Sequence, residues 1–188
     1  MLSVLNNLFV NPIKYQQFTG EERELEREKM YELQTKSSRE ILIVAGELDP
    51  EFYNEKFVSI ICGKLKKNPN FKVEIIFSKD DRITNREERI ELLYKENRYL
   101  CDFFIYGNFE DRFSLYLSNE CPPYHFGIVD DNILLEKVHK HKTPRPVLLV
   151  KNYKSLIEKY KRYFIKQIRD NNTITRLTID DFHKFAAA

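Results

Sequence analysis

The sequence predicts a single α/β domain with a mixed, mostly parallel sheet flanked by helices. Residues 40–46 and 71–78 are two apolar runs rich in β-branched side chains, and a helical pattern separates them. Strand, helix and strand in this order form a right-handed crossover with parallel strands. A later pair of short runs around Asp131 and Asn132 has the pattern of a hairpin. No linker or repeat divides the 188 residues, so we expect one core.

The composition is that of a globular protein, with 42% hydrophobic and 32% charged residues. No apolar run is long enough to cross a bilayer, and residues 1–10 lack the basic residues of a signal peptide, so we expect a cytoplasmic protein without membrane contact. Cys62, Cys101 and Cys121 form no C-x-x-C motif, which favours reduced thiols over a metal site. Gly46 and Gly107 are isolated, so no phosphate-cradling loop and no cofactor are predicted.

The first elements are predicted from caps and helical spacing. Residues 1–10 have the pattern of a short amphipathic helix, and Thr19 with Glu22 forms a capping box before a charged helix over about 20–36. That helix has few apolar positions and should lie at the surface. The run 40–46 is predicted to be a strand buried on both faces.

Caps also place the middle of the chain. Asp49 and Pro50 predict the start of a helix that continues to Lys67. Residues 71–78 are the second strand, and Asn85 with Glu88 opens a helix through about residue 98.

The remaining elements follow from shorter patterns. We expect strands over 101–106, 113–117 and 146–150, a long helix capped by Asn152 that ends near Asp170, and a last short helix after Thr178. The domain therefore spans residues 20–170, with an N-terminal segment over 1–19 and a C-terminal extension over 171–185. The final residues 186–188 are three alanines, typical of a vector remnant.

The hairpin over 124–129 and 133–138 contains the candidate catalytic residues. With Asp131-Asn132 as the turn, His125 lies opposite Val138 and diagonal to Glu136 and Lys140 on one face. An imidazole, a carboxylate and an ammonium group would then gather there, although no complete catalytic motif is present. His139 and His141 add two imidazoles, which favour a basic, phosphate-attracting loop over a metal site.

Charge is unevenly distributed along the chain. Residues 21–56 carry eleven acidic and six basic side chains, whereas residues 137–169 carry eleven basic side chains and one acidic. Four basic residues form one stripe of the last long helix: Lys159, Arg162, Lys166 and Arg169. Such a stripe indicates either a phosphate-bearing partner, with nucleic acid as the first choice, or only a solvated helix face.

The order of elements over about 22–169 resembles one half of the phospholipase D superfamily. The resemblance rests on Ser38-Arg39-Glu40 before the strand 41–46, on the helix from Asp49, on the strand 72–77, and on a late strand that ends in Asp130-Asp131. In active members this late strand carries a histidine that attacks phosphorus, a lysine two residues on, and an aspartate further along. Two such halves, from one chain or from a dimer, make one active site.

This chain departs from the family motif in either alignment. With His125 as the family histidine, the lysine position is Gly127 and the aspartate position is Asn132. With Asp130 as the family aspartate, His125 falls on the lysine and Pro123 on the histidine. The resemblance therefore implies the fold and a homodimer, but not the hydrolase chemistry.

The sequence thus predicts a catalytically degenerate domain that binds a phosphate-bearing partner, with nucleic acid as the first choice. One alternative is a divergent phosphodiesterase or nuclease that uses His125 with Glu136 and Lys140. Another is a structural interaction module organised by the charged helix over 20–36.

Overall fold

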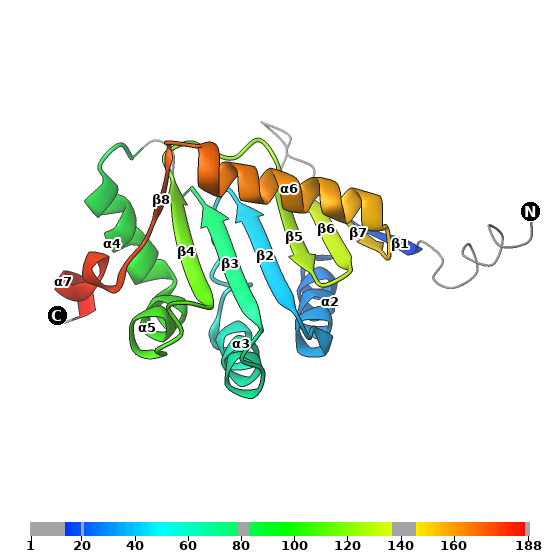
Figure 1. Cartoon of the computed structure of the whole chain (residues 1–188), viewed down its shortest axis with the longest axis horizontal. Helices are drawn as coiled ribbons and strands as arrows, with labels where there is room; N and C mark the ends of the chain where they lie inside the picture. Colours follow the sequence, from blue (N-terminus) through cyan, green and yellow to red (C-terminus); the bar gives the residue numbers. More distant parts are fainter. Residues whose placement is uncertain (1–13, 20, 79–82, 137–145, 187–188) are drawn as a thin grey trace, which may run out of the picture.

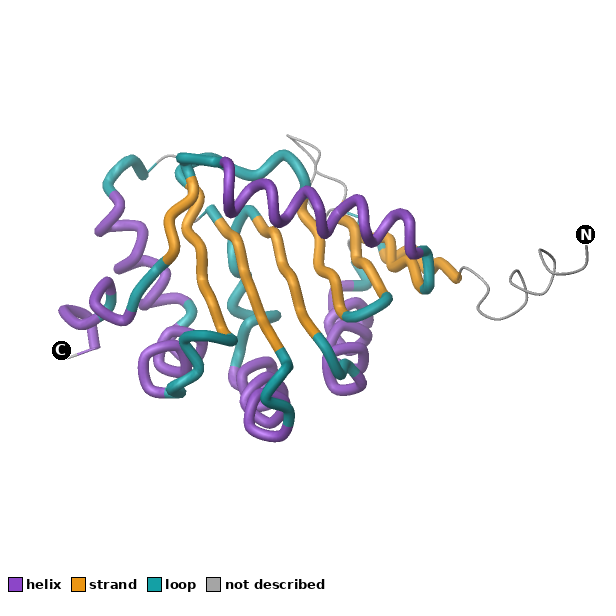
Figure 2. Tube along the Cα trace, viewed as in Figure 1, coloured by secondary structure: helices purple, strands orange, loops and turns teal. Residues whose placement is uncertain are grey.

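The structure, a computed structural model, describes residues 14–19, 21–78, 83–136 and 146–186. These residues form one α/β domain around an eight-stranded mixed sheet with the strand order β1-β7-β6-β5-β2-β3-β4-β8 (Figures 1 and 2). The predicted fold class is therefore confirmed. The helix expected over 1–10 lies outside the described residues.

The bounds of the elements are as follows. The strands are β1 Lys14–Phe18, β2 Glu40–Ala45, β3 Lys72–Phe77, β4 Phe113–Ser118, β5 His125–Val129, β6 Asn132–Glu136, β7 Val147–Lys151 and β8 Ile174–Arg176. The helices are α2 Arg23–Lys36, α3 Glu55–Lys67, α4 Arg86–Glu96, α5 Arg98–Tyr106, α6 Lys154–Asp170 and α7 His183–Ala186, with a 3-10 turn η1 at Ile179–Asp181.

The parallel part of the sheet is smaller than expected. Strands β2, β3 and β4 pair in parallel, and the other five pairings among the described strands are antiparallel. One reason is that two residues separate β5 from β6 and ten separate β6 from β7, whereas a parallel pairing needs a crossover of about a dozen or more. Strand β1, which the sequence did not predict, then adds to β7 at the edge.

Helices cover both faces of the sheet, but unequally. Helix α6 crosses one face, whereas α2, α3 and α5 lie on the other (Figure 1). Strand β2 shows why its apolar run is continuous: Ile41 and Ile43 pack in the core under α3, while Leu42 and Val44 pack under α6. The prediction of a strand buried on both faces is confirmed.

Two predicted elements were wrong in type or start. Residues 101–106, expected as a strand, belong to helix α5, since Leu100, Cys101, Phe104 and Ile105 are buried at helical spacing. A short apolar run cannot distinguish these two structures. Helix α3 begins at Glu55 rather than near Asp49, because the Asn54 side chain accepts hydrogen bonds from two N–H groups of its first turn.

Part of the C-terminal extension completes the domain. Strand β8 pairs antiparallel with β4, and Leu177 and Phe182 are buried in the same core as α3 and α5. The predicted short helix after Thr178 is a 3-10 turn with a capping box between Thr178 and Asp181. In the described part of the chain, no helix is long and apolar enough to span a membrane.

Candidate functional site

The hairpin of β5 and β6 brings His125 and Glu136 directly opposite each other. The predicted register was wrong by two residues, since the two-residue loop is Asp130-Asp131 and Asp130 adopts the positive φ of 51° that the tight turn requires. A shift of two keeps every side chain on its predicted face, so His125 and Glu136 still share one face. The other predicted neighbours, Val138 and Lys140, lie outside the described residues.

The imidazole of His125 is held from three sides. Its Nδ1 lies 2.9 Å from Oε2 of Glu136, and its Nε2 lies 3.6 Å from Sγ of Cys121. Because an ionised carboxylate only accepts hydrogen bonds, the proton of the pair is placed on Nδ1. Gly46 forms the third side: a Cβ there would approach Cε1 of His125 to 2.7 Å, so only glycine leaves room for the buried ring.

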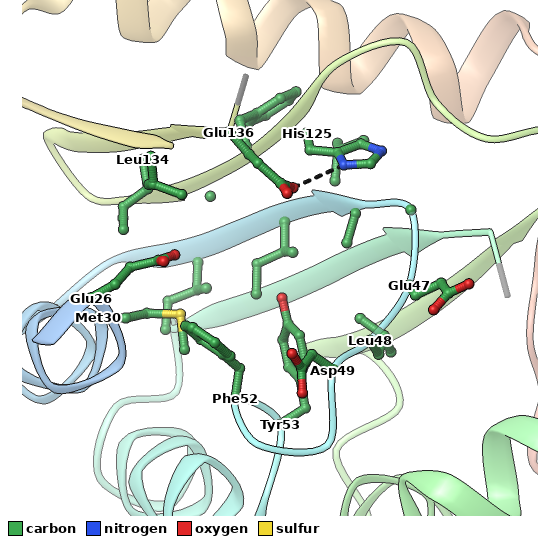
Figure 3. Close-up of a pocket in the computed structure, with 18 of the residues that line it drawn as sticks. Glu26, Met30, Glu47, Leu48, Asp49, Phe52, Tyr53, His125, Leu134 and Glu136 are labelled. Atoms are coloured by element: carbon green, nitrogen blue, oxygen red, sulfur yellow. Dashed lines mark hydrogen bonds and ion pairs between the residues drawn. The ribbon is translucent and has the colours of Figure 1, made fainter. Parts of the chain in front are cut away.

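The pair lies in a cavity of about 570 Å³ between the sheet, helix α2 and the segment 46–53. Figure 3 shows Glu26 and Met30 of α2, Phe52 and Tyr53 of the segment, and the His125–Glu136 pair around the same space. Parallel strands of open α/β sheets place ligands beyond their carboxyl ends, and β2 ends here at Ala45.

The described lining of this cavity is acidic. Its carboxylates belong to Glu26, Glu47, Asp49, Glu96 and Glu136. The guanidinium group of Arg23 forms an ion pair with Asp49. The pKa of Glu26 is raised to about 7, chiefly by burial and also by the negative charges of Glu136 and Asp49, whereas Arg23 opposes the shift. A cavity with this charge disfavours an anionic phosphate group.

The surroundings of Tyr53 also disfavour negative charge in the cavity. Its hydroxyl lies deep in the lining, and burial, reinforced by Glu136 and Asp49, raises the pKa of Tyr53 well above its usual range. Each negative neighbour disfavours a further negative charge at this position.

Asp130, the family aspartate in one alignment, has a structural contact instead. Its carboxylate accepts hydrogen bonds from the N–H groups of Ser38, Arg39 and Glu40, at 2.8, 3.0 and 3.1 Å. It follows the far end of β5, roughly 16 Å from His125 at about 3.3 Å per residue. The carboxylate therefore anchors the start of β2 and lies outside the cavity.

Gly127, the family lysine position in the other alignment, faces the cavity beside His125. A Cβ built there meets nothing within 4 Å, so the absence of a side chain leaves open space. The position supplies no cation to the imidazole, although it has room for one.

The predicted basic stripe is on the opposite face of the sheet from His125. Lys159, Arg162 and Lys166 are exposed on α6, while Ile157 and Phe164 of the same helix are buried against the sheet. Arg169 belongs to α6, but its side chain is outside the described residues. The two sets of predicted site residues therefore do not converge on one site.

The aromatic side chains of α6 face inward. Tyr160 and Tyr163 make edge-on contacts with Tyr124 and Phe126. They pack between helix and sheet, as their helical spacing indicates.

Sequence reasoning missed most of the cavity lining. Glu26 was assigned to a surface helix, and Cys121 and Gly46 carried no motif. One signal was available: Glu47 follows directly after a buried strand, where open α/β sheets bind ligands. Among the described residues, no group of three or more His, Cys, Asp or Glu is placed to hold a metal ion.

Comparison with solved structures identifies the class of fold. Phosphatidylserine synthase from Haemophilus influenzae matches 88% of this chain with a TM-score of 0.58 and 17% identity. NucT from Helicobacter pylori matches 83% with a TM-score of 0.51 and 16% identity. The archaeal chromatin protein TrmBL2, which shows a novel mode of DNA binding, matches 92% with a TM-score of 0.52 and 12% identity.

The chain therefore has a phospholipase D-like fold, as the resemblance implied. It spans 58% of TrmBL2, 40% of the synthase and 96% of NucT. No family model matches the sequence, and no curated protein does. At these identities the likeness defines the fold alone.

Proposed function

We propose that this chain is a non-catalytic phospholipase D-like domain that binds nucleic-acid phosphates through α6. The observation that carries the proposal is the exposed stripe of Lys159, Arg162 and Lys166. Seven residues of helix separate its ends, a length of about 10 Å at about 1.5 Å per residue. Phosphates of one DNA strand recur about every 3.4 Å along the axis, so the length of the stripe spans three or four phosphates.

Helix α6 is suited to such contacts. Its inner side is fixed by buried Ile157 and Phe164, and Lys161 on its flank is paired with Glu40 at 2.5 Å. The stripe thus stands on a helix that is rigidly attached to the sheet. TrmBL2, which matches most of this chain in fold, binds DNA, and this supports nucleic acid as the class of partner. The homodimer expected from the sequence stays a prediction.

Salt dependence tests this proposal directly. We expect the wild-type chain to bind a short DNA duplex at low salt, with an affinity that falls as salt rises. If three phosphates are neutralised, the slope of log K against log salt should be about −2.7, because each contact contributes about −0.9. Fluorescence anisotropy of a labelled duplex measures it. Absence of binding at low salt, or a slope near zero, would contradict the proposal.

A divergent phosphodiesterase is the second candidate, and the His125–Glu136 pair favours it. A carboxylate at 2.9 Å from Nδ1 orients an imidazole for attack or proton transfer through Nε2. Against it stand the acidic lining of the cavity and the glycine at the lysine position. Loss of one electrostatic contact to a transition state costs about 10²–10³ in rate.

We therefore expect no hydrolysis of bis-nitrophenyl phosphate or plasmid DNA, with or without divalent metal. The assay compares wild type with His125→Ala under identical purification. Hydrolysis by the wild type that disappears in His125→Ala would refute the non-catalytic proposal and favour the phosphodiesterase. Equal rates in both proteins would indicate a contaminating enzyme.

A further inference from the structure

We propose that the cavity beside His125 binds an organic cation, a small aliphatic amine whose ammonium group is held by Glu26 and whose methylene chain lies against Phe52 and Tyr53. This site is on the face of the sheet opposite to α6. The proposal therefore goes beyond nucleic-acid binding and stands independently of it.

Glu26 provides the first argument. Its side chain is half-buried in the cavity lining, and its carboxylate makes no ion pair and no hydrogen bond with the described residues. Neighbouring Arg23 is engaged with Asp49. A carboxylate removed from water without a partner is costly, and an ammonium group would offset that cost.

Gln34 provides an independent second argument. Its side chain lines the same cavity, is 1% exposed, and its Oε1 has no hydrogen-bond partner among the described residues. Glu26, Met30 and Gln34 follow at intervals of four on α2, so they lie along one stripe of the helix. Buried side-chain acceptors are nearly always satisfied. The stripe thus offers two unfilled acceptors, one charged and one neutral, on either side of a thioether.

The aromatic part of the cavity lining is suited to a ligand with an apolar chain and a cationic end. Phe52 and Tyr53 are buried in the lining, and the guanidinium of Arg23 already lies 5.4 Å from the ring centroid of Phe52. Aromatic faces attract cations at such distances. A volume of about 570 Å³ lies within the range of small-molecule sites.

The test is calorimetric titration of the full chain with 1,5-diaminopentane, 1,5-pentanediol and glutarate, which share one chain length and differ in charge. We expect the diamine to bind and the other two not to bind. Glu26→Gln should weaken diamine binding at least tenfold. Glu24→Gln, at an exposed carboxylate of the same helix, is the matched control and should have no effect.

A second variant and a pH series sharpen the result. Gln34→Met keeps the volume but removes both polar atoms, and should weaken the diamine about threefold. Wild-type affinity should rise about tenfold from pH 6 to pH 8, because a carboxyl with a pKa of about 7 must lose its proton to hold an ammonium group. The charged groups that act on Glu26 are Arg23, Glu136 and Asp49, and Glu26→Gln should flatten the pH profile.

Three outcomes would overturn the proposal. These are no diamine binding at millimolar concentration, equal affinity in Glu26→Gln, or preferential binding of glutarate, which would make the cavity an anion site. Substitutions on α6 should leave diamine binding unchanged. Failure of the cation site and failure of nucleic-acid binding are therefore distinguishable.

Discussion

Replacement of Lys159, Arg162 and Lys166 by glutamine is expected to weaken DNA binding by about two to three orders of magnitude at 0.1 M salt. Each phosphate contact contributes about −0.9 to the slope of log K against log salt. This corresponds to about eightfold in affinity at 0.1 M salt relative to about 1 M. Three contacts multiply to about 500-fold. The three side chains are exposed, and the buried side of α6 is untouched, so the fold should be unaffected. Anisotropy titrations of a labelled duplex measure the change.

The matched control replaces three other exposed lysines, Lys66, Lys67 and Lys95, by glutamine. These lie in the last turns of α3 and α4, and α3 covers the face of the sheet opposite to α6. Both triple variants change the net charge by the same amount, so long-range attraction falls equally. An equal loss of affinity in the two variants would mean that net charge, and not the stripe, causes binding. The slope of log K against log salt should approach zero only in the α6 variant, because that variant alone loses the three phosphate contacts of about −0.9 each.

The sequence predicted the parts of the fold whose patterns are long or whose neighbours are close. A run such as Ile41–Val44, apolar at every position and rich in β-branched side chains, favours a strand covered on both sides. The amphipathic pattern of α6 likewise predicts both its buried side and its basic stripe. Short apolar runs gave less information, and residues 101–106 were misassigned because helix and strand share the same composition there.

The candidate site was predicted only where one hairpin builds it. Alternation along β5 and β6 is enough to place His125 and Glu136 on one face, even with the register wrong by two. The rest of the cavity comes from α2 and the segment 46–53, which are distant in sequence from the hairpin. Glu26 and Gln34 have a functional meaning only once α2 is placed over this face of the sheet. No local pattern specifies that placement.

Asp130→Ala is expected to lower the free energy of unfolding by about 3 kcal/mol. Three backbone N–H groups, those of Ser38, Arg39 and Glu40, would lose a charged acceptor, and hydrogen bonds to charged groups are each worth about 1.5–3 kcal/mol when water does not replace them. At this exposed end of the strands, water can accept hydrogen bonds from the same N–H groups and so offsets part of the loss. Alanine at the positive φ of residue 130 adds about 1 kcal/mol. Urea denaturation measures the difference.

Asp131→Ala is the matched control, since Asp131 is the other residue of the same loop. It pairs with Arg39 at 2.7 Å, but both side chains are more than half exposed, so the pair is worth less than about 1 kcal/mol. Asp130→Asn should fall between the two, because asparagine tolerates positive φ but has one acceptor oxygen instead of two. Equal stabilities of Asp130→Ala and Asp131→Ala would refute the anchoring role.

The anchor at Asp130 also bears on the cavity. Strand β5 pairs with β2 from Val129 opposite Ile41 to Phe126 opposite Val44, and this register leads His125 to Gly46 at the other end. If Asp130 holds the pairing at Val129, its loss should loosen the pairing at the opposite end, where His125 lies. The imidazole resonances of His125 should therefore shift in Asp130→Ala but not in Asp131→Ala. The carboxylate of Asp130 would then position His125 indirectly, because it fixes β5, the strand that carries the imidazole.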